Sequence, residues 1–535
     1  MRDLNPAGTA ALVLAAAVLL GFAKDTAAAP VRQHDVVILG GTMVDGTGAA
    51  PRRADIAIAG GRIVAVGDLS TAAESAGRVI DATGLHVFPG FIDTHSHAAG
   101  GLAREDLKTG HALLAQGITT VMVNPDGGGP VDMAEQRLGF ESRGVGVNIA
   151  QLVPHGSVRR AVMGMQDREA TGEELDRMRE LVATGMREGA FGLSSGLYYS
   201  PGSWAPTSEV IELSKIAAQF GGAYQSHIRD ESDYNIGLIA AVDEVIEISR
   251  EAGITGVVTH VKALGPRVWG QGAEIVRRID AARAEGLEVY ADQYPYEASG
   301  TGIVGALVPR WALAGAEGAF EARLASPRER ARLVAEMREN LDRRGGADRL
   351  VLQGGPHKGM TIAEVAGQRG LDPVETALAL LVESQERGGG GTGLTSFNMA
   401  EEDIETLMAA PWTMTSSDGT LWAPGEGNPH PRGFGAFPRR IRKYVMEKGV
   451  GTVPQAVHAM SGLPARVYHI AARGVLAEGI AADIVVVDLD RFRDTATYDN
   501  PHGHAEGVVF AFVNGEAAID DGHFTDALGG RVLTR

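Results

Sequence analysis

The sequence predicts an α/β protein that combines a parallel β/α barrel with a small β domain. A chain of 535 residues exceeds what one hydrophobic core usually holds, so at least two structural units are expected. Apolar strand segments alternate with helical patterns through residues 89–464, which favours a parallel sheet with a barrel as the leading candidate. Short β-rich runs at 30–88 and 465–535 predict one discontinuous β domain built from both termini.

The first 29 residues have the pattern of a secretory signal peptide. Arg2 precedes an apolar run from Ala10 to Phe22, and the small residues Ala27–Ala29 follow it. The run is shorter than the roughly 20 residues that span a bilayer comfortably. We expect cleavage after residue 29 and a periplasmic or secreted protein with no stable membrane span. The alternatives are an uncleaved anchor and a mis-assigned start.

Paired turn residues divide the terminal β segments into hairpins. Gly60-Gly61 separates Asp55–Ala59 from Arg62–Gly67, and Asn514-Gly515 closes the run Val508–Val513. Such pairs favour the tight turns that join antiparallel strands. The other strand candidates of these segments are Val36–Leu39, which ends at Gly40-Gly41, and Asp483–Asp488.

Strand and helix candidates alternate through the middle of the chain. The helical patterns are Glu173–Thr184, Thr207–Gln219 and Ile236–Ala252. Residues 300–357 interrupt the alternation with a charged helical segment near Pro327–Arg344, and we expect an insertion that covers the active site at the barrel mouth. The strand candidates are Thr119–Val123, Phe191–Leu193, Ala223–Ser226, Gly256–Thr259, Val289–Ala291 and Trp412–Thr415.

Composition and charge narrow the class of partner. A formal charge of −18 argues against a nucleic-acid backbone as ligand, because phosphate contacts need clustered Lys and Arg. The chain has no cysteine, which excludes disulfides, cysteine nucleophiles and thiolate metal ligands. We therefore expect a small-molecule substrate and no nucleic-acid partner, while the oligomeric state stays open.

Histidines and carboxylates follow the predicted strands. His95-Ser96-His97 ends an apolar run, and residues two apart on an extended segment point to the same side. The carboxyl ends of barrel strands meet at one edge, which carries the chemistry. One buried histidine would be unremarkable, but the whole series predicts a site for one or two divalent ions, with zinc suited to imidazole. Its members are His95, His97, Asp126, His227, His260 and Asp418.

Seven motifs accompany these residues: Phe91–His97, Gly192–Gly202, Ser226–Glu231, Tyr294–Tyr296, Phe397–Met399, Ser417–Gly419 and His430–Arg432. Together they resemble the amidohydrolase superfamily and, within it, the N-acyl-D-amino-acid deacylases (D-aminoacylases). The resemblance covers nearly all of the mature chain. The His-x-His pattern is typical of the whole superfamily, whereas the Tyr-Ser-Pro-Gly and His-Pro-Arg blocks are much more specific to the deacylases.

The resemblance implies a distorted (β/α)8 TIM-type barrel with a small β-sandwich domain built from both termini. It also implies that His227 and His260 hold a tight metal ion, and that His95 and His97 hold a second, weaker one. Asp418 matches the acid–base residue of the family.

Three further residues acquire substrate roles through the resemblance. Lys262 would touch the substrate, and Tyr294 would lie beside the scissile group. Arg432 would bind the substrate carboxylate, since a guanidinium matches a carboxylate as a fork. From the residues alone, Lys262 would be interpreted as an exposed charge and Arg432 as a surface salt bridge.

Asp126 marks the one clear departure from the family pattern. The deacylases usually place a metal-binding cysteine after the second strand, in a Gly-Asn-Cys-Gly setting, where this chain has Val123–Gly128 with Asp126 at the cysteine position. A hard carboxylate in place of a thiolate should weaken the preference for zinc over harder metals. Asn124–Gly127 is also a good turn sequence, so Asp126 is either a ligand or a turn residue. The carboxylated lysine of other branches has no candidate after Phe191–Leu193.

These observations predict a metal-dependent amidase that releases a carboxylate and a free D-amino acid from N-acyl-D-amino acids. Asp418 would take a proton from water and pass it to the leaving nitrogen. The rivals are a cyclic-amide hydrolase or dipeptidase, and a non-catalytic binding protein on the same fold. Arg432 argues against substrates without a free carboxylate, and Asp418 argues against a binding protein. A Ser-His-Asp hydrolase is disfavoured, since no Gly-x-Ser-x-Gly sits on a strand-to-helix elbow.

Overall fold

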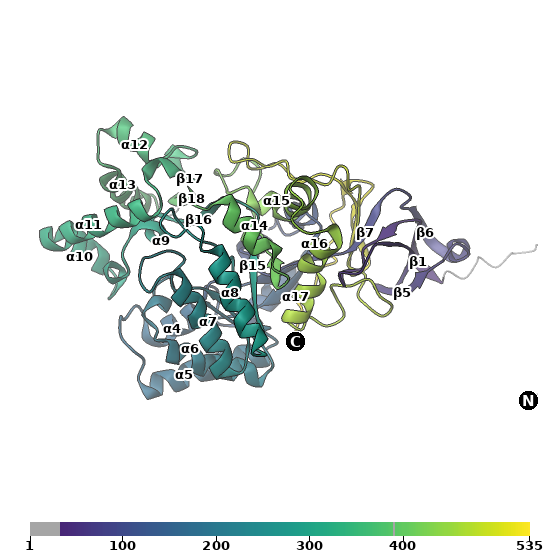
Figure 1. The fold of residues 1–535 in the computed structure, drawn as a ribbon, viewed down its shortest axis with the longest axis horizontal. Helices are drawn as coiled ribbons and strands as arrows, with labels where there is room; N and C mark the ends of the chain where they lie inside the picture. The colour runs from purple at the N-terminus through teal and green to yellow at the C-terminus, as the bar shows by residue number, and fades with distance from the viewer. Residues whose placement is uncertain (1–32, 389–390) are drawn as a thin grey trace, which may run out of the picture.

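A computed structural model describes residues 33–388 and 391–535 (Figure 1). The predicted signal peptide, residues 1–29, lies outside the described residues. Within the described part of the chain, no helix is long and apolar enough to cross a membrane. The molecule is elongated, with a β domain at one end, a barrel in the middle and a helical unit projecting from the far side (Figure 1).

The small β domain consists of two sheets that pack face to face, which confirms the predicted sandwich from both termini. Apolar side chains such as Ile56 and Ile58 from one sheet meet Ile484 and Phe512 from the other. The first sheet has the order β5 (Arg62–Gly67), β4 (Asp55–Ala59), β1 (His34–Leu39) and β6 (Ala76–Asp81). The second has the order β23 (His523–Phe524), β22 (Glu516–Asp520), β21 (Val508–Val513), β20 (Ile484–Val487), β7 (His86–Pro89), β2 (Thr42–Met43) and β3 (Arg52–Arg53).

Two of the predicted hairpin turns have the expected backbone. Gly60 and Gly61 join β4 to β5, and Asn514 and Gly515 join β21 to β22, all with positive φ, which is the requirement of a type I′ turn. Gly40-Gly41 does not form a hairpin, because the chain crosses there from β1 in the first sheet to β2 in the second.

The apolar run before His95 belongs to two different sheets. β7 pairs with β20 of the sandwich, whereas β8 (Phe91–Asp93) pairs with β9 (Ile118–Val123) of the barrel. Gly90 lies between them, and a Cβ there would come within 2.1 Å of Thr119 Oγ1. Glycine is therefore required where the chain passes between the two units.

The barrel is built from two arcs of parallel strands, as predicted. One arc has the order β10 (Asn148–Gln151), β9 and β8. The other has the order β11 (Val153–Pro154), β12 (Gly192–Gly196), β13 (Ala223–His227), β14 (Thr255–Val258), β15 (Val289–Gln293) and β19 (Thr413–Thr415). Leu152 separates β10 from β11, and the two strands belong to different arcs. Beyond β8 and β19, the His97 N–H donates to Gly419 O at 3.0 Å and the Asp418 N–H to His95 O at 2.9 Å, which brings predicted site residues side by side.

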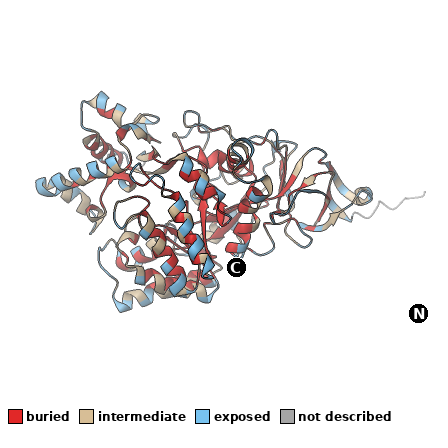
Figure 2. Ribbon diagram, viewed as in Figure 1, coloured by how far each residue is buried: buried red, intermediate tan, exposed pale blue. Residues whose placement is uncertain are grey.

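Helices cover the outside of the barrel, with exposed outer faces and buried inner faces (Figure 2). α6 begins at Thr207, as predicted, and buries Val210, Leu213 and Ala217 against the core. This spacing of three and four residues keeps one face of the helix apolar. The α-helices outside the inserted unit are α1 (Ala99–Leu102), α2 (His111–Leu114), α3 (Met133–Arg143), α4 (His155–Met163), α5 (Gly172–Arg187), α6 (Thr207–Gln219), α7 (Leu238–Ala252), α8 (Gly272–Ala284), α14 (Glu401–Ala409), α15 (Arg432–Arg439), α16 (Val453–Met460) and α17 (Gly462–Val467), and a π-helix at Arg440–Glu447 follows α15.

Between β15 and α14 the chain forms a unit with its own apolar core. The segment 300–357, expected as an insertion, lies within this unit, which extends from Ala298 to Phe397 because β16 and β17 both pair with the later strand β18. Its elements are β16 (Ala298–Gly302), α9 (Ile303–Leu307), α10 (Ala319–Ala325), α11 (Pro327–Arg343), β17 (Leu350–Leu352), α12 (Ile362–Arg369), α13 (Pro373–Glu386) and β18 (Gly393–Phe397).

Candidate metal centre and substrate cavity

A cavity of about 850 Å³ opens at the carboxyl ends of the barrel strands. It is lined by His97, Asp126, His227, His260, Lys262, Tyr294, Asp418 and Arg432. His95, the remaining predicted site residue, is fully buried and lies next to Asp126 and Asp418. The structure thus brings all of the predicted site residues together, including Lys262 and Arg432, which are buried and not surface charges.

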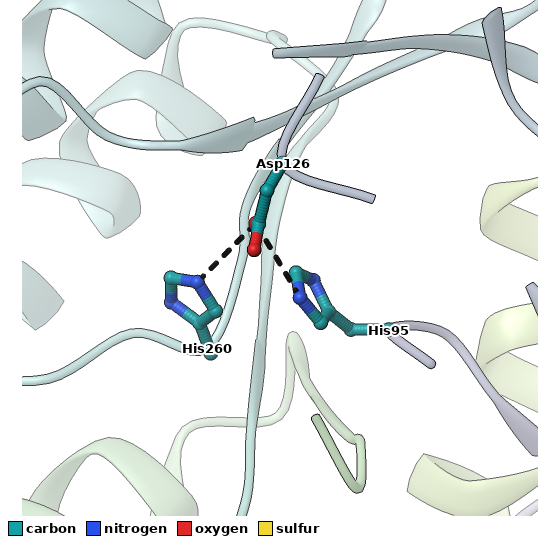
Figure 3. A group of neighbouring side chains, drawn as sticks. All are labelled: His95, Asp126 and His260. Atoms are coloured by element: carbon teal, nitrogen blue, oxygen red, sulfur yellow. Dashed lines mark ion pairs between the residues drawn. The ribbon is translucent and has the colours of Figure 1, made fainter. Parts of the chain in front are cut away.

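The Asp126 carboxylate lies among four imidazole rings. Its Oδ1 atom is 3.4 Å from His95 Nε2, 3.5 Å from His260 Nε2 and 3.6 Å from His227 Nδ1. Its Oδ2 atom is 3.4 Å from His97 Nε2. Figure 3 shows the carboxylate between the rings of His95 and His260. These separations are long for hydrogen bonds, but ligand atoms of a tetrahedral zinc site are about 3.4 Å apart when each lies roughly 2.1 Å from the ion.

Several of the candidate ligand atoms around Asp126 have no hydrogen-bond partner. His95 Nε2, Asp126 Oδ1 and both ring nitrogens of His227 are buried without a hydrogen bond. Buried polar atoms are normally satisfied, so their convergence fits a cation bound between them. Imidazole nitrogens with a carboxylate are a donor set that zinc accepts.

A hydrogen bond on the Nδ1 side of the His95 ring directs its Nε2 atom towards Asp126. Thr259 Oγ1 donates to Asp292 Oδ2 at 2.8 Å, so it accepts from His95 Nδ1 at 2.6 Å. Gln225 Nε2 donates to the same hydroxyl at 3.2 Å. Because His95 Nδ1 carries the proton, Nε2 is left with a lone pair for a metal. Sequence reasoning missed Thr259 and Asp292, whose only signal was their place at strand ends.

Glu231 is a second supporting residue that sequence reasoning did not assign. Its Oε1 atom is 3.1 Å from His260 Nδ1 and forms an ion pair with Lys262, whose Nζ is 2.7 Å from the same ring nitrogen. Burial alone would raise the pKa of Glu231, but the Lys262 ammonium and the imidazoles of His227 and His260 hold that pKa below its ordinary value. Glu231 therefore stays ionised and fixes both Lys262 and the His260 ring.

Three site residues have a left-handed backbone. Asp126 has φ 56°, His260 has φ 36° and Asp418 has φ 49°. Asp tolerates this region better than most residues, but such conformations cost energy and collect at functional sites. Asp126 thus occupies a turn and at the same time presents its carboxylate to the imidazoles, so the turn and the ligand interpretations are compatible.

Asp418 and Arg432 form a buried ion pair beside the histidines. Asp418 Oδ1 is 3.2 Å from His97 Nε2, and its Oδ2 atom accepts from the Arg432 guanidinium at 2.7 Å. Burial would raise the pKa of Asp418, but the positive charge of Arg432 holds it well below the usual range. The Arg432 guanidinium also lies 4.6 Å from the centre of the Tyr294 ring. Asp418 is therefore ionised, which is the protonation state that a general base requires.

Two neighbours make room for Arg432 and orient it. His430 Nδ1 accepts the Arg432 backbone N–H at 3.0 Å, and His430 Nε2 lies 2.9 Å from Ala298 O at the start of β16. A Cβ at Gly300 would come within 2.8 Å of the guanidinium, so the inserted unit approaches the site through a glycine.

Ser194, in the sequence Gly192–Gly196, is buried and does not have the geometry of a serine nucleophile. It lies inside β12, within Gly192–Gly196, and its Oγ donates to Asn124 O at 2.6 Å. Its hydroxyl is thus committed to the turn that carries Asp126, and no strand-to-helix elbow exposes it.

Comparison with known proteins places this geometry among hydrolases. A family model described as "Amidohydrolase family" matches residues 78–518. The chain is 35% identical to an N-acyl-D-glutamate deacylase of Alcaligenes xylosoxydans xylosoxydans, over 91% of this chain and 93% of that protein. It is 33% identical to a D-aminoacylase of the same organism, over 94% of this chain and 98% of that protein.

Solved structures agree with the sequence comparison. The N-acyl-D-glutamate deacylase of Bordetella bronchiseptica, complexed with zinc and a phosphonate that mimics the tetrahedral intermediate, is similar with a TM-score of 0.78 and 32% identity. A D-aminoacylase described by its binuclear metal centre has a TM-score of 0.78 and 31% identity. In both cases 94% of this chain and 100% of the other chain are covered.

Proposed function

Because the chain belongs to the amidohydrolase family, in the branch of the N-acyl-D-amino-acid deacylases, we propose that it is a zinc-dependent hydrolase of N-acyl-D-amino acids. The reaction releases a carboxylate and a free D-amino acid. The observation that carries the proposal is the Asp126 carboxylate among four imidazoles, beside Asp418, in a cavity large enough for a small amide.

The family resemblance assigns His227 and His260 to one metal ion and His95 and His97 to a second. Asp126 Oδ1 faces His95, His260 and His227, and Oδ2 faces His97, so Asp126 would contribute to both positions. His95, Asp126 and His260 are one group whose ligand atoms lie close enough together to hold a single ion. Zinc held there supplies a Lewis acid for the amide carbonyl and lowers the pKa of water to near neutral.

Asp418 moves the proton. Its Oδ1 atom, on the side of His97, takes the proton from the attacking water and later gives it to the leaving nitrogen. Arg432 keeps Asp418 in place through Oδ2. A guanidinium has five N–H donors, so Arg432 retains donors for the substrate carboxylate while one donates to Asp418.

Lys262 and Tyr294 complete the substrate contacts. The Lys262 ammonium lies 5.6 Å from the centre of the Tyr294 ring, and both residues line the cavity. Lys262 and Arg432 both contact the Tyr294 ring, so the three side chains form one wall along which a carboxylate can be oriented. A cyclic amide without a carboxylate would leave this wall unused.

The proposal is tested by hydrolysis of paired N-acetyl-D- and N-acetyl-L-amino acids and of their carboxamides. We expect turnover of the D-amino acids, weaker turnover of the carboxamides and little of the L-amino acids. Equal hydrolysis of both enantiomers, or a preference for cyclic amides, would contradict the proposal. The Asp418→Asn variant serves as the background control, because contaminating hydrolases do not depend on this residue.

We also propose that the protein is exported. The support is the sequence of residues 1–29, with a positive start, a short apolar run and small residues before position 30. A periplasmic or secreted location would give the enzyme access to N-acyl-D-amino acids outside the cytoplasm.

A further inference from the structure

Among the described residues, the buried cations Arg159, Lys262 and Arg432 are paired with the carboxylates of Glu209, Glu231 and Asp418. The nearly buried Arg229 and Arg473 are paired in the same way with Glu244 and Asp483. Arg344 departs from this pattern. It is 2% exposed, and no carboxylate among residues 33–388 and 391–535 lies within ion-pair distance of it. Arg440 is also buried without such a partner, but Arg440 does not line the cavity.

Arg344 enters the cavity from the inserted unit. It directly follows α11, and its Nε atom donates to Ala306 O at 3.2 Å. One terminal nitrogen, Nη1, is buried without a hydrogen-bond partner. The residue lines the same cavity as Asp126 and Asp418. The desolvation of a guanidinium in this position is not offset by any carboxylate of the described residues, whereas a bound anion would offset it.

Two tyrosines connect Arg344 to the metal ligands. The Tyr198 ring stacks on the imidazole of His227, with ring centres 5.6 Å apart, and its hydroxyl lies beside the Arg344 guanidinium. Tyr234 contacts both Tyr198 and Arg344, and its hydroxyl is buried without a partner. Arg344 and Tyr234 therefore present unused donors next to each other, on the His227 side of the site. Arg310 also contacts Tyr198 but donates to the carbonyls of Val308 and Gly305.

Arg344 and Arg432 thus occupy different parts of one cavity. Arg432 lies beside Asp418 and Tyr294, where the α-carboxylate of an N-acyl-D-amino acid is expected. Arg344 lies beside Tyr198, whose ring in turn contacts the His227 imidazole. A substrate whose amide carbonyl lies at the metal ligands and whose α-carboxylate reaches Arg432 can place another group at Arg344.

We propose that Arg344 binds a second carboxylate of the substrate, so that the enzyme selects N-acyl-D-amino acids with two negative groups. This inference rests on the proposed function and specifies its substrate class. The second carboxylate can belong to an acidic D-amino-acid side chain or to the acyl group. In either position it would accept hydrogen bonds from the Arg344 guanidinium, which lines the cavity.

The test compares substrates that differ only in that charge. N-acetyl-D-glutamate and N-acetyl-D-glutamine have nearly the same shape, as do N-succinyl-D-leucine and its succinamide counterpart. We expect kcat/KM to favour the carboxylate member of one pair by about 10–100-fold, the size of a buried hydrogen bond to a charged group. The first pair detects a side-chain carboxylate and the second an acyl carboxylate. Equal kcat/KM within both pairs would overturn the proposal.

The Arg344→Gln variant assigns the preference to this residue. We expect the ratio within the favoured pair to fall close to one. Arg343→Gln is the matched control, because Arg343 ends the same helix but is already paired with Asp233 and Glu339. Arg343→Gln should keep the wild-type ratio. An unchanged ratio in Arg344→Gln would overturn the proposal.

Two further measurements keep the test decisive. If Arg344→Gln does not fold, Arg344→Lys replaces it, and loss of the guanidinium fork should lower the ratio several-fold. Calorimetric titration with D-glutamate and with D-glutamine tests the recognition of a side-chain carboxylate without turnover. Absence of hydrolysis of every N-acyl-D-amino acid would refute the proposed function. Turnover without any preference that depends on Arg344 would refute only this inference.

Discussion

Replacement of Asp126 by Asn separates the two roles that this residue fills. Asn has nearly the same shape and tolerates the left-handed backbone at φ 56°, so the turn should be preserved. The negative charge, however, is lost, and an amide N–H₂ group cannot serve as a metal ligand. The substitution therefore acts on the carboxylate alone, whose two oxygens lie 3.4–3.6 Å from four imidazole nitrogens.

The expected loss of zinc affinity follows from the central position of Asp126. Removal of a residue that only supports a metal ligand typically costs about 10–100-fold in affinity. Asp126 contributes to both sets of ligands, so Asp126→Asn should weaken zinc binding by about 100-fold or more. Zinc per chain after dialysis and a competition titration with a chelating indicator measure the loss. Hydrolysis of an N-acetyl-D-amino acid on the same samples should fall in parallel.

Two companion variants complete the experiment. Asp126→Cys supplies a thiolate and should retain tight zinc. Asp126→Ala removes the ligand and also strains the turn, at a cost of about 1–2 kcal/mol of folding stability, so it should show both a lower melting temperature and lost zinc. Full zinc occupancy in both Asp126→Asn and Asp126→Ala would refute the ligand role and leave the site to the histidines and other carboxylates.

Four other predictions concern single features of the account. Asp418→Asn should keep its fold and zinc but lose about 10²–10⁴-fold in turnover, and near-normal kcat in a zinc-replete sample would exclude its acid–base role. Arg432→Lys should reduce the preference for a substrate with an α-carboxylate over its carboxamide, since the fork is lost although the charge remains; an unchanged preference would argue against that contact. Glu231→Gln should weaken zinc binding by about 10–100-fold in the same competition titration, and unaltered affinity would show that Glu231 does not position His260. Intact-mass measurement of exported protein should give a chain that starts near Pro30, whereas a full-length mass from cells that process signals would contradict cleavage.

Much of the fold could be predicted because local patterns and tertiary packing agree. Helix α6 begins at Thr207 and ends at Gln219, the range that the helical pattern of the sequence predicts. The run that leads to His95 shows the limit of such reasoning, because nothing local separates β7 from β8. β7 is separate from β8 because β7 pairs with β20, which lies nearly four hundred residues later in the chain. Only the close approach of Thr119 to Gly90 shows where the chain changes partner.

The metal site was predictable from ligands at strand ends, whereas its support was not. His95 and His97 show a spacing that sequence alone reveals. Thr259 and Asp292 act on His95 through hydrogen bonds between different strands, and single hydroxyls or carboxylates in strands are too common to stand out. Arg344 reaches the cavity because of the path of the inserted unit, which no local pattern defines.

Zinc titration of the metal-free protein tests the central claim most directly. Hydrolysis of an N-acetyl-D-amino acid and of its L-enantiomer should be followed in the same samples as zinc is added, with bound zinc measured at each point. The account predicts that D-specific activity rises with bound zinc and levels off when the sites of wild-type protein are filled, while Asp126→Asn remains nearly inactive at the same zinc concentrations. Full activity of the metal-free protein, or equal hydrolysis of both enantiomers, would contradict it.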